Sequence, residues 1–404
     1  MFHASRFTYF NFHLLTHTVM KITQLEFIPV SIPYTHREVS SQIRRDGVSD
    51  VIVKAATDEG LIGWGESCSG ANVESVVETL KAMEPFVLGR SPWESEAIRA
   101  ELWRRAIWAF RKPTASFAYA GIDMALWDIC GKACGQPLYN LFGGRVRSHA
   151  NYFCYLSQGS NEKITAQCQD GLTRGFHVFY LKVGLDIDAE LEMVRTIRET
   201  IGPKNKIRLD ANCAWGVNEA VRNLAQLDQY RIDFIEQPVL QDPPTNMQEV
   251  RSRSRVALSA NEGMWSVEDA YRQIRERTAD VYCFSSYWVG SLTLFQHLCQ
   301  VAHFEGLQIC KHTHGELGIA AAAAHHILLT LPNIVDGNQQ TATMMQDDVL
   351  KQTLPIAEGP NWGVPQGIGL GVEVDEDKVR RYHEFFRGRG QLLPYDPADI
   401  GKDY

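Results

Sequence analysis

The sequence has no uninterrupted apolar stretch of the length that crosses a membrane, about 18 residues or more. The first nineteen residues are polar and aromatic and lack an apolar core, so we do not expect them to be a secretory signal. We therefore expect a soluble, cytoplasmic protein with no membrane partner. We expect residues 1–19 to be disordered or to result from an upstream start, since Met20 begins a segment that resembles a natural N-terminus.

Two further classes are disfavoured by what is missing. Lysine and arginine form no basic stripe with interleaved aromatic residues, and the net charge is −8, so no nucleic-acid partner is expected. The nine cysteines are scattered, odd in number and without the spacing of zinc ligands, which indicates a reducing compartment. The chain has 404 residues, of which 45% are hydrophobic, and this suffices for one large domain and a smaller one.

The first part, residues 20–145, has the pattern of an α+β domain. Three alternating segments typical of strands come first, and helical spacing follows. The polar stretch between the first two strands, Thr35–Asp50, is long for a hairpin loop, and such loops are often functional. We expect this stretch and the loop Ser67–Asn72 to close over a neighbouring site.

From residue 146 to residue 345 the pattern changes to strand, loop and helix in repetition. Eight strand candidates are separated by helical segments: 149–155, 177–182, 206–210, 232–236, 256–260, 280–285, 307–311 and 333–336. Eight repeats are the number in a (β/α)8 TIM barrel, an α/β fold whose active sites lie at the carboxyl ends of the strands. Residues 346–404 lose this pattern, and we expect them to return to the first domain.

Three successive strands of this predicted barrel each end in one carboxylate: Asp210, Glu236 and Glu262. The intervals are equal, since 236 − 210 and 262 − 236 are both 26, and a strand with its helix needs about that length. Parallel neighbours would bring the three acids to one rim, where they repel one another unless a cation lies between them. Each acid alone is more simply a surface residue, but the equal spacing favours a site for Mg²⁺, which prefers oxygen ligands.

Several short motifs, in order between Met20 and Asp375, resemble the enolase superfamily and within it the mandelate racemase and muconate cycloisomerase branch. They are Gly63–Glu66, Gly121–Asp128, Leu141–Gly144, Leu209–Asn212, Ile235–Pro238 and Gly369–Val374. The resemblance implies a modified (β/α)7β barrel with an N-terminal α+β capping domain, and a homo-oligomer. It also implies a chemistry in which Mg²⁺ binds a substrate carboxylate, a base removes the α-proton, and the metal stabilises the enediolate.

The resemblance also implies roles at the other strand ends. Lys182 matches the second lysine of the family's Lys-x-Lys motif and is the expected base, its pKa lowered by the nearby cation; Tyr180 replaces the first lysine. His312 matches the histidine of strand seven and would act as acid or base on the opposite face. Asp336 matches an acidic position of strand eight and would donate a proton or a hydrogen bond toward the carboxylate.

Two departures from the family pattern concern strand six. Ser285 stands where the family has an aspartate that partners the histidine, and Trp288 stands at a nearby lysine position. Without an aspartate, the tautomer and basicity of His312 are not fixed.

Asn212 is expected to orient the metal ligands. Contacts with a substrate are expected from Tyr180, Asn212, Ser285, Trp288 and, toward a second anionic group, Arg44 or Arg45.

The favoured reaction is dehydration of a sugar acid or related hydroxy acid, in which Lys182 removes the α-proton and His312 helps the β-hydroxyl leave. A racemase or epimerase needs bases on both faces, which the missing aspartate disfavours. Cycloisomerisation needs one acid and a lactone substrate. A non-catalytic relative that retains the metal site would also account for the departures at Tyr180, Ser285 and Trp288.

Overall fold

The computed structural model describes residues 19–67, 72–106 and 108–395. The expectations for residues 1–18 and for the loop at 68–71 lie outside these ranges. Within them, no helix combines the length and the apolar character that a bilayer crossing requires.

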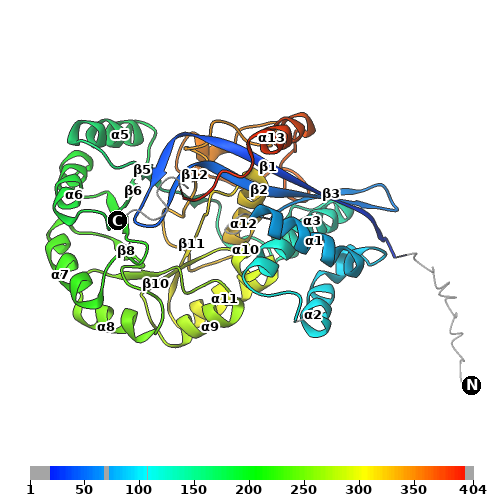
Figure 1. Cartoon of the computed structure of the whole chain (residues 1–404), viewed down its shortest axis with the longest axis horizontal. Coiled ribbons are helices and arrows are strands. Elements are labelled where there is room, and N and C mark those ends of the chain that lie inside the picture. The colour runs from blue at the N-terminus through cyan, green and yellow to red at the C-terminus, as the bar shows by residue number, and fades with distance from the viewer. Residues whose placement is uncertain (1–18, 68–71, 107, 396–404) are drawn as a thin grey trace, which may run out of the picture.

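The first unit is an antiparallel sheet backed by helices (Figure 1). Its strands are β1 (Ile22–Val39), β2 (Arg44–Thr57) and β3 (Ile62–Ser67), and its helices are α1 (Val73–Val87), α2 (Ser95–Arg105) and α3 (Thr114–Cys134). The polar stretch at 35–50 is mainly strand rather than loop, because β1 and β2 continue to a short turn at 40–43. The result is a long hairpin that reaches over the second unit.

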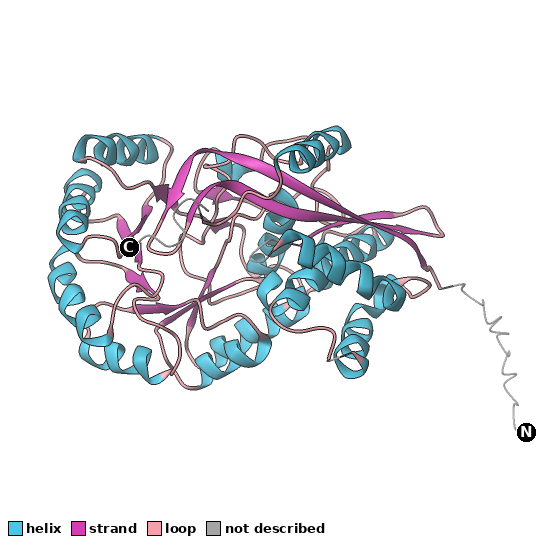
Figure 2. Cartoon of the chain, viewed as in Figure 1, coloured by secondary structure: helices cyan, strands magenta, loops and turns pink. Residues whose placement is uncertain are grey.

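The second unit is a parallel sheet, curled into a barrel and covered on its outside by helices (Figures 1 and 2). The strands follow one another in chain order: β5 (Cys154–Leu156), β6 (Val178–Lys182), β7 (Lys206–Asp210), β8 (Phe234–Glu236), β9 (Leu258–Ala260), β10 (Val281–Phe284) and β11 (Gln308–Lys311). The covering helices are α5 (Asn161–Thr173), α6 (Ile187–Ile201), α7 (Val217–Leu227), α8 (Thr245–Arg253), α9 (Val267–Arg275), α11 (Leu292–Phe304) and α12 (Gly318–Leu329). This is the predicted TIM-barrel type of fold with an N-terminal cap.

The predicted eighth strand, 333–336, is irregular and is represented by single parallel bridges. Ile334 pairs with Ile309 of β11, and Asn338 pairs with Tyr152, which lies between β4 (Ala150–Asn151) and β5. The N–H of Asn338 donates to the carbonyl of Asn151 at 2.7 Å, which closes the ring of strands. The closing contacts thus continue beyond residue 336, where the sequence pattern placed the end of the strand.

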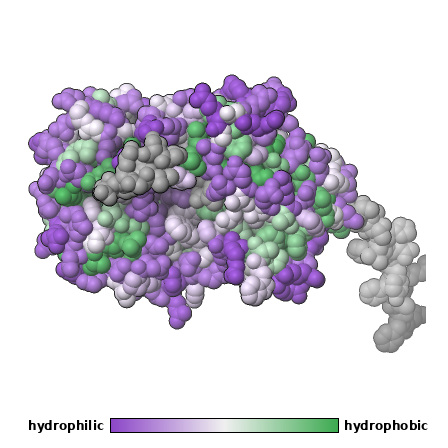
Figure 3. All heavy atoms as spheres, viewed as in Figure 1, coloured by the Kyte–Doolittle hydropathy of each residue, from purple (hydrophilic) through white to green (hydrophobic). Residues whose placement is uncertain are grey.

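The chain then returns from the barrel to the antiparallel sheet. In α13 (Glu376–Arg389), the Nδ1 atom of His383 lies 2.7 Å from the carbonyl oxygen of Pro29 in β1, and Glu376 accepts from Lys54 of β2 at 2.8 Å. The face drawn in Figure 3 is mainly hydrophilic, because most hydrophobic residues gather in buried clusters inside the barrel and beneath the antiparallel sheet.

Buried carboxylates of the first unit bind the amino ends of barrel helices. Glu66 accepts from the N–H groups of Leu317 and Ala320, at 2.7 and 2.9 Å, where α12 begins. Asp123 accepts from the N–H of Leu292 at 2.8 Å, where α11 begins. Helix N-termini carry unpaired N–H groups and a partial positive charge, so these two acids fasten the cap to the barrel.

Candidate active site

The carboxyl ends of neighbouring strands bring one lysine and three carboxylates together. Lys182, Asp210 and Glu236 are the last residues of β6, β7 and β8, and they are register partners across the sheet, Lys182 with Asp210 and Asp210 with Glu236. Glu262 follows the end of β9 by two residues. All four side chains are buried. The acids that the spacing singled out therefore lie on adjacent strands at one rim.

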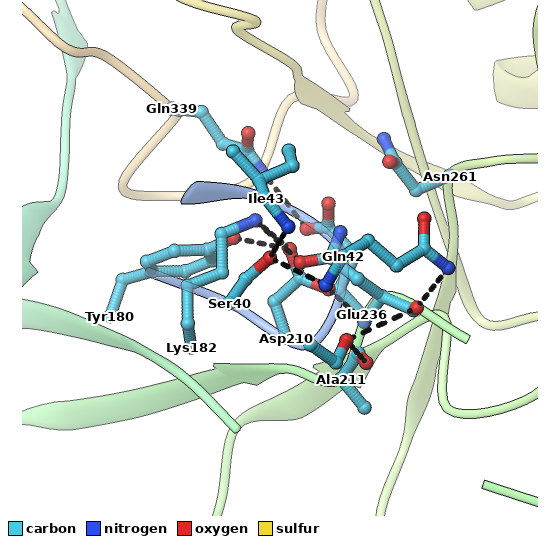
Figure 4. Close-up of polar contacts among 12 residues, drawn as sticks. Ser40, Gln42, Ile43, Tyr180, Lys182, Asp210, Ala211, Glu236, Asn261 and Gln339 are labelled. Carbon is cyan, nitrogen blue, oxygen red and sulfur yellow. Dashed lines mark hydrogen bonds and ion pairs between the residues drawn. The ribbon is translucent and has the colours of Figure 1, made fainter. Parts of the chain in front are cut away.

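Asp210 is the centre of a hydrogen-bond network (Figure 4). Its Oδ2 accepts from the ammonium of Lys182 at 2.6 Å and from the hydroxyl of Tyr180 at 2.5 Å. Lys182 also donates to Asn212 Oδ1 at 2.9 Å, and the amide of Asn212 donates to Glu262 at 2.9 Å. Asn212 adopts a left-handed backbone conformation (φ 44°), which turns its side chain back toward the strand ends.

The charges of the site act strongly on one another. Burial and, after it, the charge of Asp210 raise the pKa of Glu236 well above its ordinary value and that of Glu262 to about 7. For Lys182, burial alone would lower the pKa, but Asp210, Glu38 and Glu236 outweigh it and raise the pKa. Lys182 is therefore an ammonium that offsets part of the negative charge.

The three carboxylates have the donor chemistry of a magnesium site. Glu236 Oε1 and Glu262 Oε2 are buried without a hydrogen-bond partner in the described part of the chain, so both oxygens are available to a cation. Hard oxygen ligands of this kind suit Mg²⁺. Among the described residues, no three His, Cys, Asp or Glu side chains are already arranged as a metal centre, and Asp210 meets Lys182 instead.

His312 lines the same cavity as Lys182, but the residues around it differ from the family pattern. Its ring packs on that of Trp288, with centroids 4.2 Å apart and planes 34° apart. Its Nδ1 is buried without a partner in the described residues, and so is the hydroxyl of Ser285 at the end of β10. Burial, followed by His314 and Lys182, holds the pKa of His312 well below its ordinary value, so the imidazole is neutral.

The prediction for Asp336 is wrong. Asp336 accepts from Asn151 at 3.0 Å and lies 2.7 Å from Nε2 of His177, the residue before β6. Lys182 is the last residue of that strand, so Asp336 lies at the opposite, amino end of the barrel. The sequence pattern ended strand eight at 336, whereas the chain continues along the barrel for several more residues.

Gln339, three residues further on, occupies the position that was assigned to Asp336. Its amide donates to Glu236 Oε2 at 2.6 Å (Figure 4), and its carbonyl oxygen accepts from the N–H of Thr313 at 3.3 Å. Its own N–H donates to the carbonyl of Lys311 at 2.9 Å. Gln339 thus joins a carboxylate of the site to the loop that carries His312. Sequence reasoning missed it, although a strand eight extended by a few residues would have pointed to it.

The hairpin of β1 and β2 closes the mouth of the site. In its turn, Ser41 Oγ donates to the carbonyl of Ala211 at 2.9 Å, and the amide of Gln42 donates to the carbonyl of Asn212 at 2.6 Å. A cavity of about 70 Å³ remains beneath the turn. It is lined by Glu38, Gln42, Ile43, Arg45, Lys182, Asn212, Asn261, Glu262, Trp265, Trp288, His312, Thr313 and His314.

Arg45, and not Arg44, faces this cavity. Consecutive side chains of a strand point to opposite faces, and Arg45 donates to Glu38 at 2.6 Å and to the carbonyl of His314 at 2.6 Å. The backbone N–H of Arg44 donates to Pro394 at 3.0 Å, and its side chain lies beside the C-terminal segment. The substrate contact predicted for Arg44 is therefore wrong.

Comparisons with known proteins agree with this geometry. Residues 33–143 match the family model for the mandelate racemase / muconate lactonizing enzyme N-terminal domain, and residues 163–378 match the enolase C-terminal domain-like model. The chain is 28% identical to an N-succinyl-L-Arg/Lys racemase of Bacillus cereus, over 91% of this chain and 99% of that protein. It is 28% identical to a muconate cycloisomerase of Acinetobacter baylyi, over 88% and 98%. The structure of a muconate lactonizing enzyme from Pseudomonas fluorescens in complex with muconolactone superposes with a TM-score of 0.83 at 25% identity, covering 90% of this chain and 99% of that one.

Proposed function

Because the chain belongs to the mandelate racemase / muconate lactonizing enzyme family of the enolase superfamily, we propose that it is an isomerase that removes the α-proton of a carboxylate substrate through Lys182. The observation that carries the proposal is the position of the Lys182 amine, buried at the cavity and 2.6 Å from Asp210. A Mg²⁺ ion held by Asp210, Glu236 and Glu262 would supply positive charge that offsets the charge gathering on the substrate carboxylate.

The residues of this chain support a reaction with a single base. Lys182 is held by Asp210 and Asn212, so its nitrogen is fixed at the cavity wall. A Mg²⁺ ion held by the carboxylates would offset the negative charge that raises the pKa of Lys182, so the side chain could act as a neutral amine and accept the proton. His312 is neutral and has no carboxylate partner among the described residues, so it is a weak base for the opposite face. One-base isomerisation, as in cycloisomerases, therefore fits better than racemisation, which exchanges protons on both faces. The names of the relatives, a racemase and a cycloisomerase, support an isomerase in general.

Dehydration of a hydroxy acid, the reaction favoured by the sequence alone, remains the second candidate. It begins with the same proton removal by Lys182. Its specific support is Nδ1 of His312, which has no partner in the described part of the chain and in one tautomer can donate a hydrogen bond to a departing hydroxyl.

Exchange of the α-proton with D₂O tests the shared step. In the presence of Mg²⁺ and a panel of hydroxy acids, lactones and acylamino acids, we expect the proton signal of one class to disappear from the NMR spectrum. Lys182→Ala should slow this exchange on the order of a thousandfold, whereas Lys81→Ala, on the exposed surface of α1, should not. Exchange that survives Lys182→Ala would reject Lys182 as the base. With the reaction repeated in H₂O, a product of unchanged mass indicates an isomerase, and loss of one water indicates a dehydratase.

A further inference from the structure

A buried ion pair from the capping hairpin lines the same cavity as Lys182 and Glu262. Arg45 Nε donates to Glu38 Oε2 at 2.6 Å, and the two side chains are only 8% and 4% exposed. A second nitrogen of Arg45, Nη1, donates to the carbonyl of His314 at 2.6 Å. The guanidinium is therefore fixed by the hairpin on one side and by the barrel on the other.

The pair has hydrogen-bonding atoms that the described part of the protein does not use. Neither Glu38 Oε1 nor Arg45 Nη2 has a hydrogen-bond partner there, although both side chains line the cavity. Neither atom is among the fully buried polar atoms that lack a partner, so both keep some exposed surface and are accessible to a ligand group. One atom is an acceptor and the other is a donor, so a ligand group that offers both functions would satisfy the pair.

The charge of the pair selects against an anionic ligand group. The positive charge of Arg45 is already compensated by Glu38, and Glu38 is near enough to Lys182 to raise its pKa. A second carboxylate at this place would meet the negative charge of Glu38 as well as the positive charge of Arg45, and it offers no proton to Glu38 Oε1. A hydroxyl group accepts from Arg45 and donates to Glu38 without adding charge.

We propose that Glu38 and Arg45 form a subsite for an uncharged substrate group that both donates and accepts, such as a hydroxyl, on the cap side of the cavity that Lys182 lines. The substrate class is then a hydroxylated monocarboxylic acid, and a dicarboxylic acid is excluded. The inference rests on the proposed function in placing the reacting carboxylate beside Lys182. From the sequence we expected a second anionic group of the substrate to meet Arg44 or Arg45. The ion pair of Arg45 with Glu38 favours an uncharged group instead.

Matched pairs of short-chain acids that differ only in the terminal group, CH₂OH or COO⁻, provide the test. Their dissociation constants are measured by calorimetry on the full chain with Mg²⁺. We expect the alcohol member to bind at least about tenfold more tightly. In Glu38→Gln the charge of Arg45 is no longer compensated, and the preference should change to the diacid by a similar factor. The double variant Glu38→Gln/Arg45→Gln carries no charge at the pair and should bind both members about equally. It also provides a second measurement in case the single variant misfolds.

Asp46→Asn is the matched control, because Asp46 forms an ion pair with Arg37 on the same hairpin at 2.7 Å but is 57% exposed. It should leave the ratio unchanged. The subsite is rejected if the wild-type protein prefers diacids, if Glu38→Gln does not alter the ratio, or if no member of any pair binds. Proton exchange measured on the same samples separates the two proposals: absent exchange with a retained binding preference rejects the proton chemistry and leaves the subsite standing.

Discussion

Tyr180 and Lys182 donate to the same oxygen of Asp210, at 2.5 and 2.6 Å. The two side chains come from one strand and point to one face, since they are two residues apart. The family pattern has a lysine where Tyr180 stands, so a neutral donor replaces a second positive charge. Burial raises the pKa of Tyr180 well above its ordinary value, and the hydroxyl stays protonated and continues to donate. Tyr180 therefore orients Asp210 whether or not Lys182 turns toward a substrate.

Replacing Tyr180 by phenylalanine should weaken the proposed metal site without unfolding the protein. The ring packs on Phe153 with centroids 4.4 Å apart, and phenylalanine retains this packing. Loss of the hydroxyl leaves Asp210 without its neutral donor, and removal of such an orienting contact lowers metal affinity about 10- to 100-fold. Titration calorimetry with Mg²⁺ measures this. Tyr152→Phe is the control, because its hydroxyl contacts His325 on α12 and not the site; equal affinities for the two variants would contradict the prediction.

Gln339→Leu should also lower the affinity for Mg²⁺, by about tenfold or more. The amide of Gln339 holds Glu236 at 2.6 Å, and the second oxygen of Glu236 already lacks a partner within the described residues, so the carboxylate would lose its orientation. The neighbouring Gln340 donates instead to the carbonyl of Phe153 at 3.0 Å. Gln340→Leu should therefore reduce thermal stability and leave metal affinity unchanged. Activity of Gln339→Leu at saturating Mg²⁺ close to that of the wild-type protein would show that the contact acts only through the metal site.

The sequence predicted the architecture well, because strands and their ends can be recognised from short local patterns of residues. Apolar runs buried on both faces are typical of parallel strands, and each acid was the last or nearly the last residue of such a run, as Asp210 and Glu236 are. The position of Asp336 was misjudged because the last strand makes only isolated bridges and leaves no apolar run whose end can be recognised.

The cavity wall could not be predicted from local patterns. Glu38 and Arg45 meet because β1 and β2 continue through a stretch whose polar composition indicated a loop. The contact of Trp288 with His312 joins two loops that follow different strands, and no spacing in the sequence predicts this contact. The homo-oligomer and the cytoplasmic location stay predictions, since the contacts within one chain define neither.

Glu66→Ala should destabilise the attachment of the cap to the barrel. Glu66 accepts from the N–H groups of Leu317 and Ala320, and alanine would leave both donors buried without that partner. The expected cost is about 3 kcal/mol of unfolding free energy. Glu66→Gln keeps one acceptor oxygen and should cost less than half as much. Urea unfolding measures both, and Glu59→Ala on the exposed turn between β2 and β3 is the control. Equal stability of the alanine variant and the wild-type protein would show that the contacts of Glu66 do not hold the cap on the barrel.

Acid should destabilise the fold through two buried histidines of α12. His325 lies between the hydroxyl of Tyr152, at 2.9 Å, and the carbonyl of Gly363, at 2.8 Å, and its ring stacks on Trp362. His326 lies 3.0 Å from the carbonyl of Leu370. Burial lowers the pKa of His325 to about 3 and that of His326 to about 4, from the ordinary value of 6.5. Both rings are therefore neutral in the folded protein throughout the neutral and mildly acidic range.

The direction of the effect follows from proton uptake. Below a pH of about 6.5 the unfolded chain protonates these histidines, while the folded protein does not until about pH 4, so the unfolded state binds more protons. The stability that they contribute is complete above about pH 6.5 and is lost as the pH falls toward 4. At about pH 5 the loss is about 2 kcal/mol for each histidine. Urea unfolding at neutral pH and near pH 5 measures it. His325→Gln should reduce the difference between the two conditions, whereas His303→Gln, at the exposed end of α11, should not. If the His325 variant loses as much stability in acid as the wild-type protein, other groups cause the acid sensitivity.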